Sequence, residues 1–356
     1  MILHEDICRF LKGNGLECST EEIEGYQVIR SGNNPAILPV SISETNPDQA
    51  RTKAEATMRL VRILSKQTGS YPLIITEDRW RSQTDMMQRR LLAHLHIYVQ
   101  IYARNCEVRK IDKKTAAAFL HANHSYGDAA CRHRYGLYLK RYTGHTVLHD
   151  KADDGSTEQP TGGDSINRYP GTERPGVGDL VAVATFSNGR KWIKGEKTIR
   201  SFEWTRYASL PGVRLSGGMG RLLKAFIEDV KPDDIMTYAD LEWSEGGVYE
   251  ALGFELEGVK SPVLFEVDGI GWQRSARIGL GVAYGDPRLR CAQTPPSRGW
   301  HVTSGHHPAL DASTAQDTLT SEISSDNSHQ EMSEYAIKYF QNLGSNKYRL
   351  KLTDYQ

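Results

Sequence analysis

A glycine-rich turn between a strand and an amphipathic helix constrains this chain more than any other feature. The strand runs into Val213, and the helix is predicted over Leu222–Val230. Glycines at a helix start leave backbone N–H groups unpaired, and the helix dipole adds positive potential there. Close packing is one reading, and phosphate binding assisted by arginines is the other. The predicted phosphate-binding residues are Val213, Arg214, Ser216, Gly217, Gly218, Met219, Gly220 and Arg221.

Strands and helices alternate around this turn from Cys106 to Val267. Helical spacing predicts a helix over Lys113–Asn123, and the apolar run Leu180–Phe186 is typical of a buried strand. The run Ile235–Ala239 predicts a further strand directly after the glycine-turn helix. This order predicts an α/β (α+β) domain over residues 105–268.

Residues 1–104 are predicted to form a separate, small α/β domain. Apolar runs at Ala36–Ile42 and Tyr71–Thr76 predict strands. Apolar residues at helical spacing predict helices over Arg51–Lys66 and over Thr84–Tyr102.

The acidic residues of this first domain do not form a nuclease motif. A restriction-type nuclease needs clustered acidic and lysine side chains beside strands to hold a metal. Only Glu44, Glu77 and Asp78 lie near predicted strand ends, and no D…ExK spacing occurs. A structural or binding role, such as a degenerate nuclease-like domain, is therefore favoured over an active nuclease.

Composition and cysteine usage exclude several classes of protein. The 356 residues include 44 basic and 44 acidic side chains, and no apolar run approaches the ~20 residues of a membrane span. The first residues lack the basic and apolar regions of a secretory signal. Five scattered cysteines without a CxxC pair predict reduced thiols rather than disulfides or structural zinc. We expect a cytoplasmic protein with no membrane partner and no metal.

Two segments are predicted to be irregular. Nine of the 28 residues from Ala152 to Asp179 are Gly or Pro, which predicts an insertion over 145–179. Residues 269–356 read as an irregular extension that ends in a strand at Lys347–Leu352.

The neutral total charge hides an asymmetry along the chain. From Glu77 to Tyr142 there are 13 basic and six acidic residues, whereas Gly299–Ile337 has six acidic and no basic residues. Such a distribution allows a nucleic-acid-binding face on the middle segment, and an ordinary solvated surface explains it equally well.

A second motif carries a family resemblance. The segment Val248–Glu255 reads VYEALGFE, and it follows the glycine-rich turn by about one helix and one strand. Together they resemble the GNAT family of N-acetyltransferases, whose fold is a mixed twisted sheet flanked by helices. Met219 stands where the family's acyl-CoA loop usually has Gly or Ala. The segments IYARNCEVRKID, AFLHANHSYG and SFEWTRYAS extend the resemblance to GNAT-like domains of phage and mobile-element proteins, including Mom-type DNA-modification and Vsr- or homing-nuclease-associated proteins.

The resemblance implies an acyl transfer from acetyl-CoA or a related activated donor to an amine. It implies that Tyr249 protonates the leaving thiolate and that Glu203 acts as the general base. A tyrosine with a pKa near ~10 is a neutral proton donor at pH 7. The acceptor amine belongs to a nucleobase or nucleic acid in this reading, because of the mobile-element resemblance and the basic middle segment.

The expected acceptor site lies at the ends of two elements. The predicted substrate residues are Asp240, Arg206, Ser244 and His124. Asp240 ends a strand, where sheets of this kind place site residues. The alternative to an enzyme is a GNAT-like module that binds nucleic acid without chemistry, which the Met219 departure favours and which Tyr249 and Glu203 disfavour. The sequence leaves the oligomeric state open.

Overall fold

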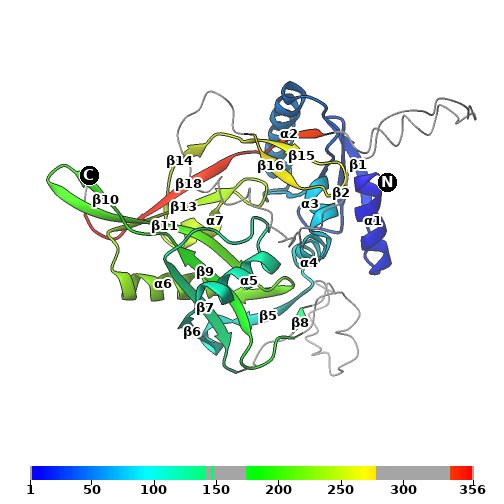
Figure 1. The fold of residues 1–356 in the computed structure, drawn as a ribbon. Helices are drawn as coiled ribbons and strands as arrows, with labels where there is room; N and C mark the ends of the chain where they lie inside the picture. Colours follow the sequence, from blue (N-terminus) through cyan, green and yellow to red (C-terminus); the bar gives the residue numbers. More distant parts are fainter. Residues whose placement is uncertain (1, 142–145, 148–173, 278–336, 355–356) are drawn as a thin grey trace, which may run out of the picture.

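The protein is described here from a computed structural model that covers residues 2–141, 146–147, 174–277 and 337–354 (Figure 1). Several sheets of mixed strand direction are flanked by helices, which confirms the predicted α+β class. The predicted insertion 145–179 and the predicted extension 269–356 lie mostly outside the described residues. Within the described residues, no helix is both long and apolar enough to cross a membrane.

The N-terminal region folds around a four-stranded sheet in the order β1-β2-β3-β4. Its long helix has clear end signals: the Asn46 side chain accepts a hydrogen bond from Gln49 N–H, and Gly69 ends the helix in the left-handed region. The strands and helices of this region are α1 (Leu3–Gly13), β1 (Ser19–Ile23), β2 (Tyr26–Arg30), β3 (Ile37–Val40), α2 (Pro47–Thr68), β4 (Leu73–Thr76), α3 (Glu77–Ser82) and α4 (Thr84–His94).

The prediction of one helix over Thr84–Tyr102 is wrong. Helix α4 ends at His94, and the chain turns at His96, whose φ is +62°, into strand β5 (Tyr98–Tyr102). The alternation of β-branched Val99 and Ile101 with polar or aromatic residues suits a strand. Tertiary pairing decides the outcome, because β5 pairs in parallel with β12 (Val213–Ser216) more than 100 residues later.

The central sheet has the strand order β14-β18-β13-β11-β9-β7-β6, with β10 paired to β11 at one end. Strands β11 and β13 are parallel, whereas the other neighbours along this order are antiparallel. The bounds are β6 (Cys106–Lys110), β7 (His133–Leu139), β9 (Leu180–Phe186), β10 (Arg190–Lys194), β11 (Lys197–Ser209), β13 (Asp234–Asp240), β14 (Glu255–Lys260) and β18 (Ser345–Lys351).

Helices cover both faces of this sheet. On one face, α6 (Gly218–Val230) places Phe226 in a parallel stack with Phe186 of β9, with ring centroids 3.8 Å apart. On the other face, α5 (Lys113–Asn123) buries Leu120 against Val183 and Ala208. The short helices α7 (Gly247–Ala251) and η1 (Ala103–Asn105) complete the described helices of this region.

Segments that are distant in the sequence share sheets and cores. Two three-stranded sheets have the orders β12-β5-β8 and β16-β15-β17, and the second packs against α2 of the N-terminal region. Their remaining strands are β8 (Thr146–Val147), β15 (Leu264–Val267), β16 (Arg274–Ala276) and β17 (Lys338–Gln341). The boundaries at residues 104 and 268 therefore stay predictions, with contacts across both.

Candidate functional site

Two parallel strands separate in the middle of the central sheet. Strands β11 and β13 pair over only three residues, and the last pair is Glu203 with Met236. Beyond it, β11 continues along β9 and β13 continues along β18. The register of β11 also shifts between Trp204 and Arg206, which is a β-bulge. We call this point after Glu203, where the paired strands diverge, the wedge.

The glycine-rich turn starts helix α6 beside this wedge. Gly217 has a φ of +76°, which favours glycine, and no side chain caps the helix. The first helical hydrogen bond runs from Arg221 N–H to the Gly217 carbonyl oxygen, so the N–H groups of Gly218, Met219 and Gly220 have no helical acceptor. The first turn contains no acidic residue, so its positive end is not neutralised locally.

Close packing explains two of these glycines as well. A Cβ at Gly218 would lie 2.6 Å from a methyl of Leu215 and 3.1 Å from the Tyr207 hydroxyl. A Cβ at Gly220 would lie 3.2 Å from Leu252, which follows α7. The turn is thus pressed between β11 and α7, while Met219 packs against the core of the central sheet. The geometry of this turn is therefore compatible both with close packing and with phosphate binding as the reason for its glycines.

Two arginines flank this helix start, and a third follows Ala103, which contacts the position of Gly217. Arg214 lies on β12 and donates to the Tyr98 hydroxyl at 2.9 Å, and Arg221 donates to the Ala103 carbonyl oxygen at 2.9 Å. The neighbouring Arg104 is exposed, and its guanidinium lies 4.6 Å from the ring centre of Tyr102. Exposed guanidinium groups beside N–H groups that have no helical acceptor are suited to phosphate oxygens.

Strand β12 supplies the other two predicted turn residues. Val213 and Ser216 pair in register with Val99 and Tyr102 of β5, and the Ser216 hydroxyl accepts a hydrogen bond from the Gln100 amide at 2.9 Å. Strand β5 therefore fixes the position of the turn.

Tyr249 points into the wedge from α7. Its ring contacts Trp204, Phe254 and Tyr348 with centroid distances of 5.7–6.0 Å. Its hydroxyl is hydrogen bonded to the Thr237 side chain, which itself donates to the Trp204 carbonyl oxygen. Burial raises the pKa of the Tyr249 hydroxyl above its ordinary value, and the Thr237 hydrogen bond opposes this rise. The group stays protonated at neutral pH.

Glu203 and Arg206 lie on the opposite face of the sheet from Tyr249. Phe202 and Trp204 pack on the α6 side, so Glu203 between them faces the α5 side. The β-bulge keeps Arg206 on that same side, where its Nε donates to the Gly127 carbonyl oxygen just beyond α5. Tyr249 and Glu203 therefore lie on opposite faces of the sheet, with the wedge between them.

His124 ends helix α5 on this second face. Its Nδ1 accepts a hydrogen bond from Tyr126 N–H at 3.1 Å, which leaves the proton of the neutral ring on Nε2. Burial, and then the nearby guanidinium groups of Arg206 and Arg79, lower the pKa of His124 to about 3. The ring is therefore a neutral hydrogen-bond donor at pH 7 and a poor base.

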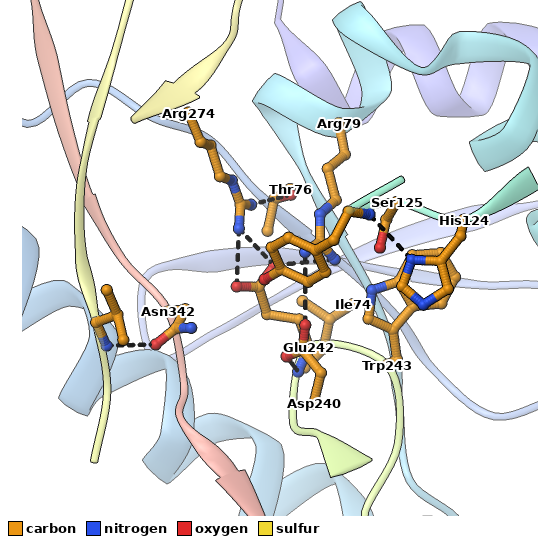
Figure 2. Close-up of polar contacts among 12 residues, drawn as sticks. Ile74, Thr76, Arg79, His124, Ser125, Asp240, Glu242, Trp243, Arg274 and Asn342 are labelled. Carbon is orange, nitrogen blue, oxygen red and sulfur yellow. Dashed lines mark hydrogen bonds and ion pairs between the residues drawn. The ribbon is translucent and has the colours of Figure 1, made fainter. Parts of the chain in front are cut away.

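Asp240 belongs to a buried ion network at the end of β13 (Figure 2). Its carboxylate lies 3.5 Å from the Arg79 guanidinium and accepts a hydrogen bond from Glu242 N–H. Arg274 of β16 donates to both oxygens of Glu242 at 3.0 Å. We call this set the buried ion network; it consists of Thr76, Asp78, Arg79, Asp240, Glu242 and Arg274.

The predicted substrate residues are not all brought together. His124 and Asp240 both lie near Arg79, and Arg206 lies near His124. Ser244 is exposed on the turn after β13, where its N–H donates to the Asp240 carbonyl oxygen. The structure therefore brings His124, Asp240 and Arg206 into one region, whereas Ser244 is exposed on the neighbouring turn.

Sequence reasoning missed three residues of this region. Tyr207 adjoins the start of α6, Arg104 follows Ala103, which contacts that start, and Arg79 lies near both Asp240 and His124. No local motif marks Arg104 or Arg79, because each reaches the site through pairing with distant segments. Tyr207 could have been found from its strand, since alternation places it on the same face as Trp204 once the bulge is known.

The three acidic residues near the predicted strand ends of the N-terminal region all form ion pairs. Glu44 pairs with Lys53 and Glu77 with Arg81, while Asp78 binds Arg274 in the buried ion network. Among the residues that the structure describes, no cluster of three or more His, Cys, Asp or Glu side chains is placed to hold a metal ion.

Comparisons with known proteins found no relative: no protein-family model matches the chain, and no curated protein matches its sequence.

Proposed function

We propose that this chain is a transferase that moves an acyl-type group from a CoA-like activated donor, such as acetyl-CoA, to an amine. The observation that carries the proposal is the wedge between parallel strands β11 and β13, with the uncapped start of α6 and the Tyr249 hydroxyl both beside it. The resemblance to GNAT proteins in the glycine-rich turn and in VYEALGFE supports the same reading. The proposed location is cytoplasmic, on the sequence argument alone.

In this proposal the donor lies on the α6 side of the sheet. The N–H groups of Gly218, Met219 and Gly220 bind its phosphates, and Arg104, Arg214 and Arg221 neutralise their charge. The thioester reaches into the wedge, where the buried surroundings strengthen every polar contact. Val213 and Ser216 hold the turn in place through β5.

The acceptor amine approaches from the α5 side, where Glu203 and Arg206 lie. The amine nitrogen attacks the thioester carbonyl carbon, a C–N bond forms and the C–S bond breaks. Glu203 takes the proton that the amine loses, directly or through water, and Tyr249 gives its proton to the leaving thiolate sulfur. His124 and Asp240 orient the acceptor, as a neutral donor and a carboxylate acceptor respectively.

Calorimetric titration with acetyl-CoA tests the donor site. We expect saturable binding to the wild-type protein and binding about tenfold or more weaker for Arg104→Gln, since a hydrogen bond to a charged group contributes about 1.5–3 kcal/mol. Arg109→Gln is the matched control, because Arg109 is also exposed and also lies 4.6 Å from a tyrosine ring, that of Tyr138. Absence of wild-type binding, or equal losses in the two variants, would contradict the proposed donor site.

The role of Tyr249 needs a separate measurement. Tyr249→Phe keeps the ring packing and removes only the hydroxyl, so acetyl-CoA affinity should stay within about twofold while free-thiol release with an amine acceptor falls strongly. Unchanged thiol release in this variant would remove Tyr249 from the mechanism.

A second candidate function is nucleic-acid binding without chemistry. The exposed, basic hairpin formed by β10 and the start of β11 favours the nucleic-acid part of that reading. The two candidates differ in donor binding, which the calorimetric titration measures directly.

A further inference from the structure

A two-stranded hairpin projects beyond the central sheet. Strand β10 pairs with the first half of β11, from Arg190 opposite Ser201 to Lys194 opposite Lys197. The chain reverses through Gly195, whose φ is +58°, and Glu196. Figure 1 shows this hairpin extending away from the body of the molecule on the side opposite α1.

The hairpin is strongly basic, and four of its cationic side chains are exposed. From Arg190 to Arg200 there are five basic residues and one acidic residue. The side chains of Arg190, Lys191, Lys197 and Arg200 are all exposed. Register places Lys191 directly opposite Arg200, and like charges directly opposite each other destabilise a strand pair. Folding alone does not favour this arrangement, whereas a polyanionic partner does.

Two large apolar side chains stand among these cations. Trp192 is 52% exposed and Ile193 is 82% exposed, and as consecutive strand residues they face opposite sides of the hairpin. The tip itself is polar, with Gly195 and Glu196 between two lysines. A hairpin that enters a membrane needs an apolar tip, so this pattern does not fit a lipid surface.

The pattern fits the groove of a DNA duplex. The major groove of B-form DNA is about 12 Å wide and admits a two-stranded β-ribbon. A ribbon of five residue pairs is about 16 Å long, which spans that groove. The side chains of the ribbon alternate between its two faces, so cations on both faces lie between the phosphate backbones that border the groove, and the apolar side chain on the inward face meets sugars and base edges. The major groove of A-form RNA is too narrow for side chains to read.

We propose that the β10–β11 hairpin binds double-stranded DNA, with Arg190, Lys191, Lys197 and Arg200 contacting phosphates and with Trp192 and Ile193 in the groove. As a binding site, this inference stands independently of the transfer reaction. As an assignment of the acceptor to DNA, it rests on the proposed function.

Fluorescence anisotropy with a dye-labelled 20-base-pair DNA duplex, without any acyl donor, tests the hairpin. Each phosphate contact contributes about −0.9 to the slope of log K against log salt. Four contacts predict an affinity loss of about 150-fold between 50 and 200 mM salt, and the double variant Arg190→Gln/Lys191→Gln should lose only about 12-fold over the same range. Removal of Lys191 also relieves the repulsion with Arg200, so the variant should melt no lower than wild type.

The matched control is Arg62→Gln/Lys66→Gln on α2, which removes the same two charges from exposed positions away from the hairpin. Control and wild type should have the same affinity and salt slope. Absence of duplex binding overturns the inference, as does an equal loss in both double variants. Binding to phosphatidylserine-containing vesicles or to an RNA duplex in preference to DNA also overturns it. Acetyl-CoA binding measured on the same proteins separates this failure from failure of the proposed function.

Discussion

Arg274 should be the most sensitive position of the buried ion network. Its side chain is 9% exposed and binds Asp78 and Glu242, whose side chains are 2% and 1% exposed. It also donates to the Thr76 hydroxyl at 2.9 Å, and its guanidinium lies 4.2 Å from the ring centre of Phe340. The substitution Arg274→Met keeps an apolar stem against that ring and removes the charge.

The expected loss follows from the carboxylates that the substitution leaves behind. Glu242 keeps Arg79 at 3.2 Å, but Asp78 loses its direct guanidinium partner while staying buried. Removal of one partner from a buried ion pair costs about 3–5 kcal/mol. We expect this decrease in the free energy of unfolding at pH 7, measured by urea denaturation followed by circular dichroism.

The stability difference between wild type and Arg274→Met should also change with pH in a definite direction. Arg274 holds the pKa of Asp78 below its ordinary value, against the opposing effect of burial. A lowered carboxyl pKa stabilises the folded state above the ordinary value near 3.8, and this contribution is lost as the pH falls through the folded-state pKa. The gap between wild type and Arg274→Met should therefore shrink below about pH 4.

Two further variants make the test of Arg274 decisive. Arg277→Met removes a half-exposed guanidinium that lies 3.6 Å from Glu266, and it should cost about 1 kcal/mol or less. Asp78→Asn in the Arg274→Met background removes the stranded charge and should restore part of the loss. A loss below about 1 kcal/mol for Arg274→Met, or a gap that does not change with pH, would refute the reasoning.

Two other substitutions have outcomes set by packing. Gly246→Ala should cost at least about 2 kcal/mol by urea denaturation, because φ there is +101° and a Cβ would lie 2.4 Å from the Tyr348 ring, whereas its neighbour Gly247→Ala meets nothing within 4 Å and should be neutral or slightly stabilising. Phe226→Ala should cost about 3–5 kcal/mol, since Phe226 is fully buried and stacked on Phe186; a loss below 2 kcal/mol would show that the core closes around the missing ring.

Local sequence patterns correctly predicted the elements whose tertiary contacts favour the same secondary structure. The apolar run at Leu180–Phe186 is β9, and the Asp112-capped helix Lys113–Asn123 is α5. The error at Tyr98–Tyr102 arose because the same apolar residues suit a helix face or a strand, and only pairing with β12 decides. Strand β18 was predicted as a strand, but nothing local shows that it lies between β13 and β14.

The candidate site likewise combines features that local sequence predicts with features that depend on the pairing of distant segments. The start of α6 was predicted correctly as a glycine-rich helix start, since turn chemistry is local. Arg104 is near it because Ala103 of the η1 turn contacts the position of Gly217, and that contact depends on the β5–β12 pairing. The wedge between β11 and β13 depends on where two strands stop pairing, which no residue type encodes.

The buried ion network and the proposed acceptor side meet at Arg79. Its guanidinium lies between Glu242 and Asp240 on one side and the rings of Tyr126 and Trp243 on the other, at 5.0 and 5.4 Å from their centres. Because Arg274 holds Glu242 and Glu242 holds Arg79, a segment after residue 268 fixes a residue of α3 beside the end of β13. Burial, and then the guanidinium groups of Arg206 and of Arg79 held in this way, lower the pKa of His124 and keep its ring neutral at pH 7. The N-terminal region thus contributes to the proposed acceptor site through this arginine. This contribution argues against a purely separate role for residues 1–104.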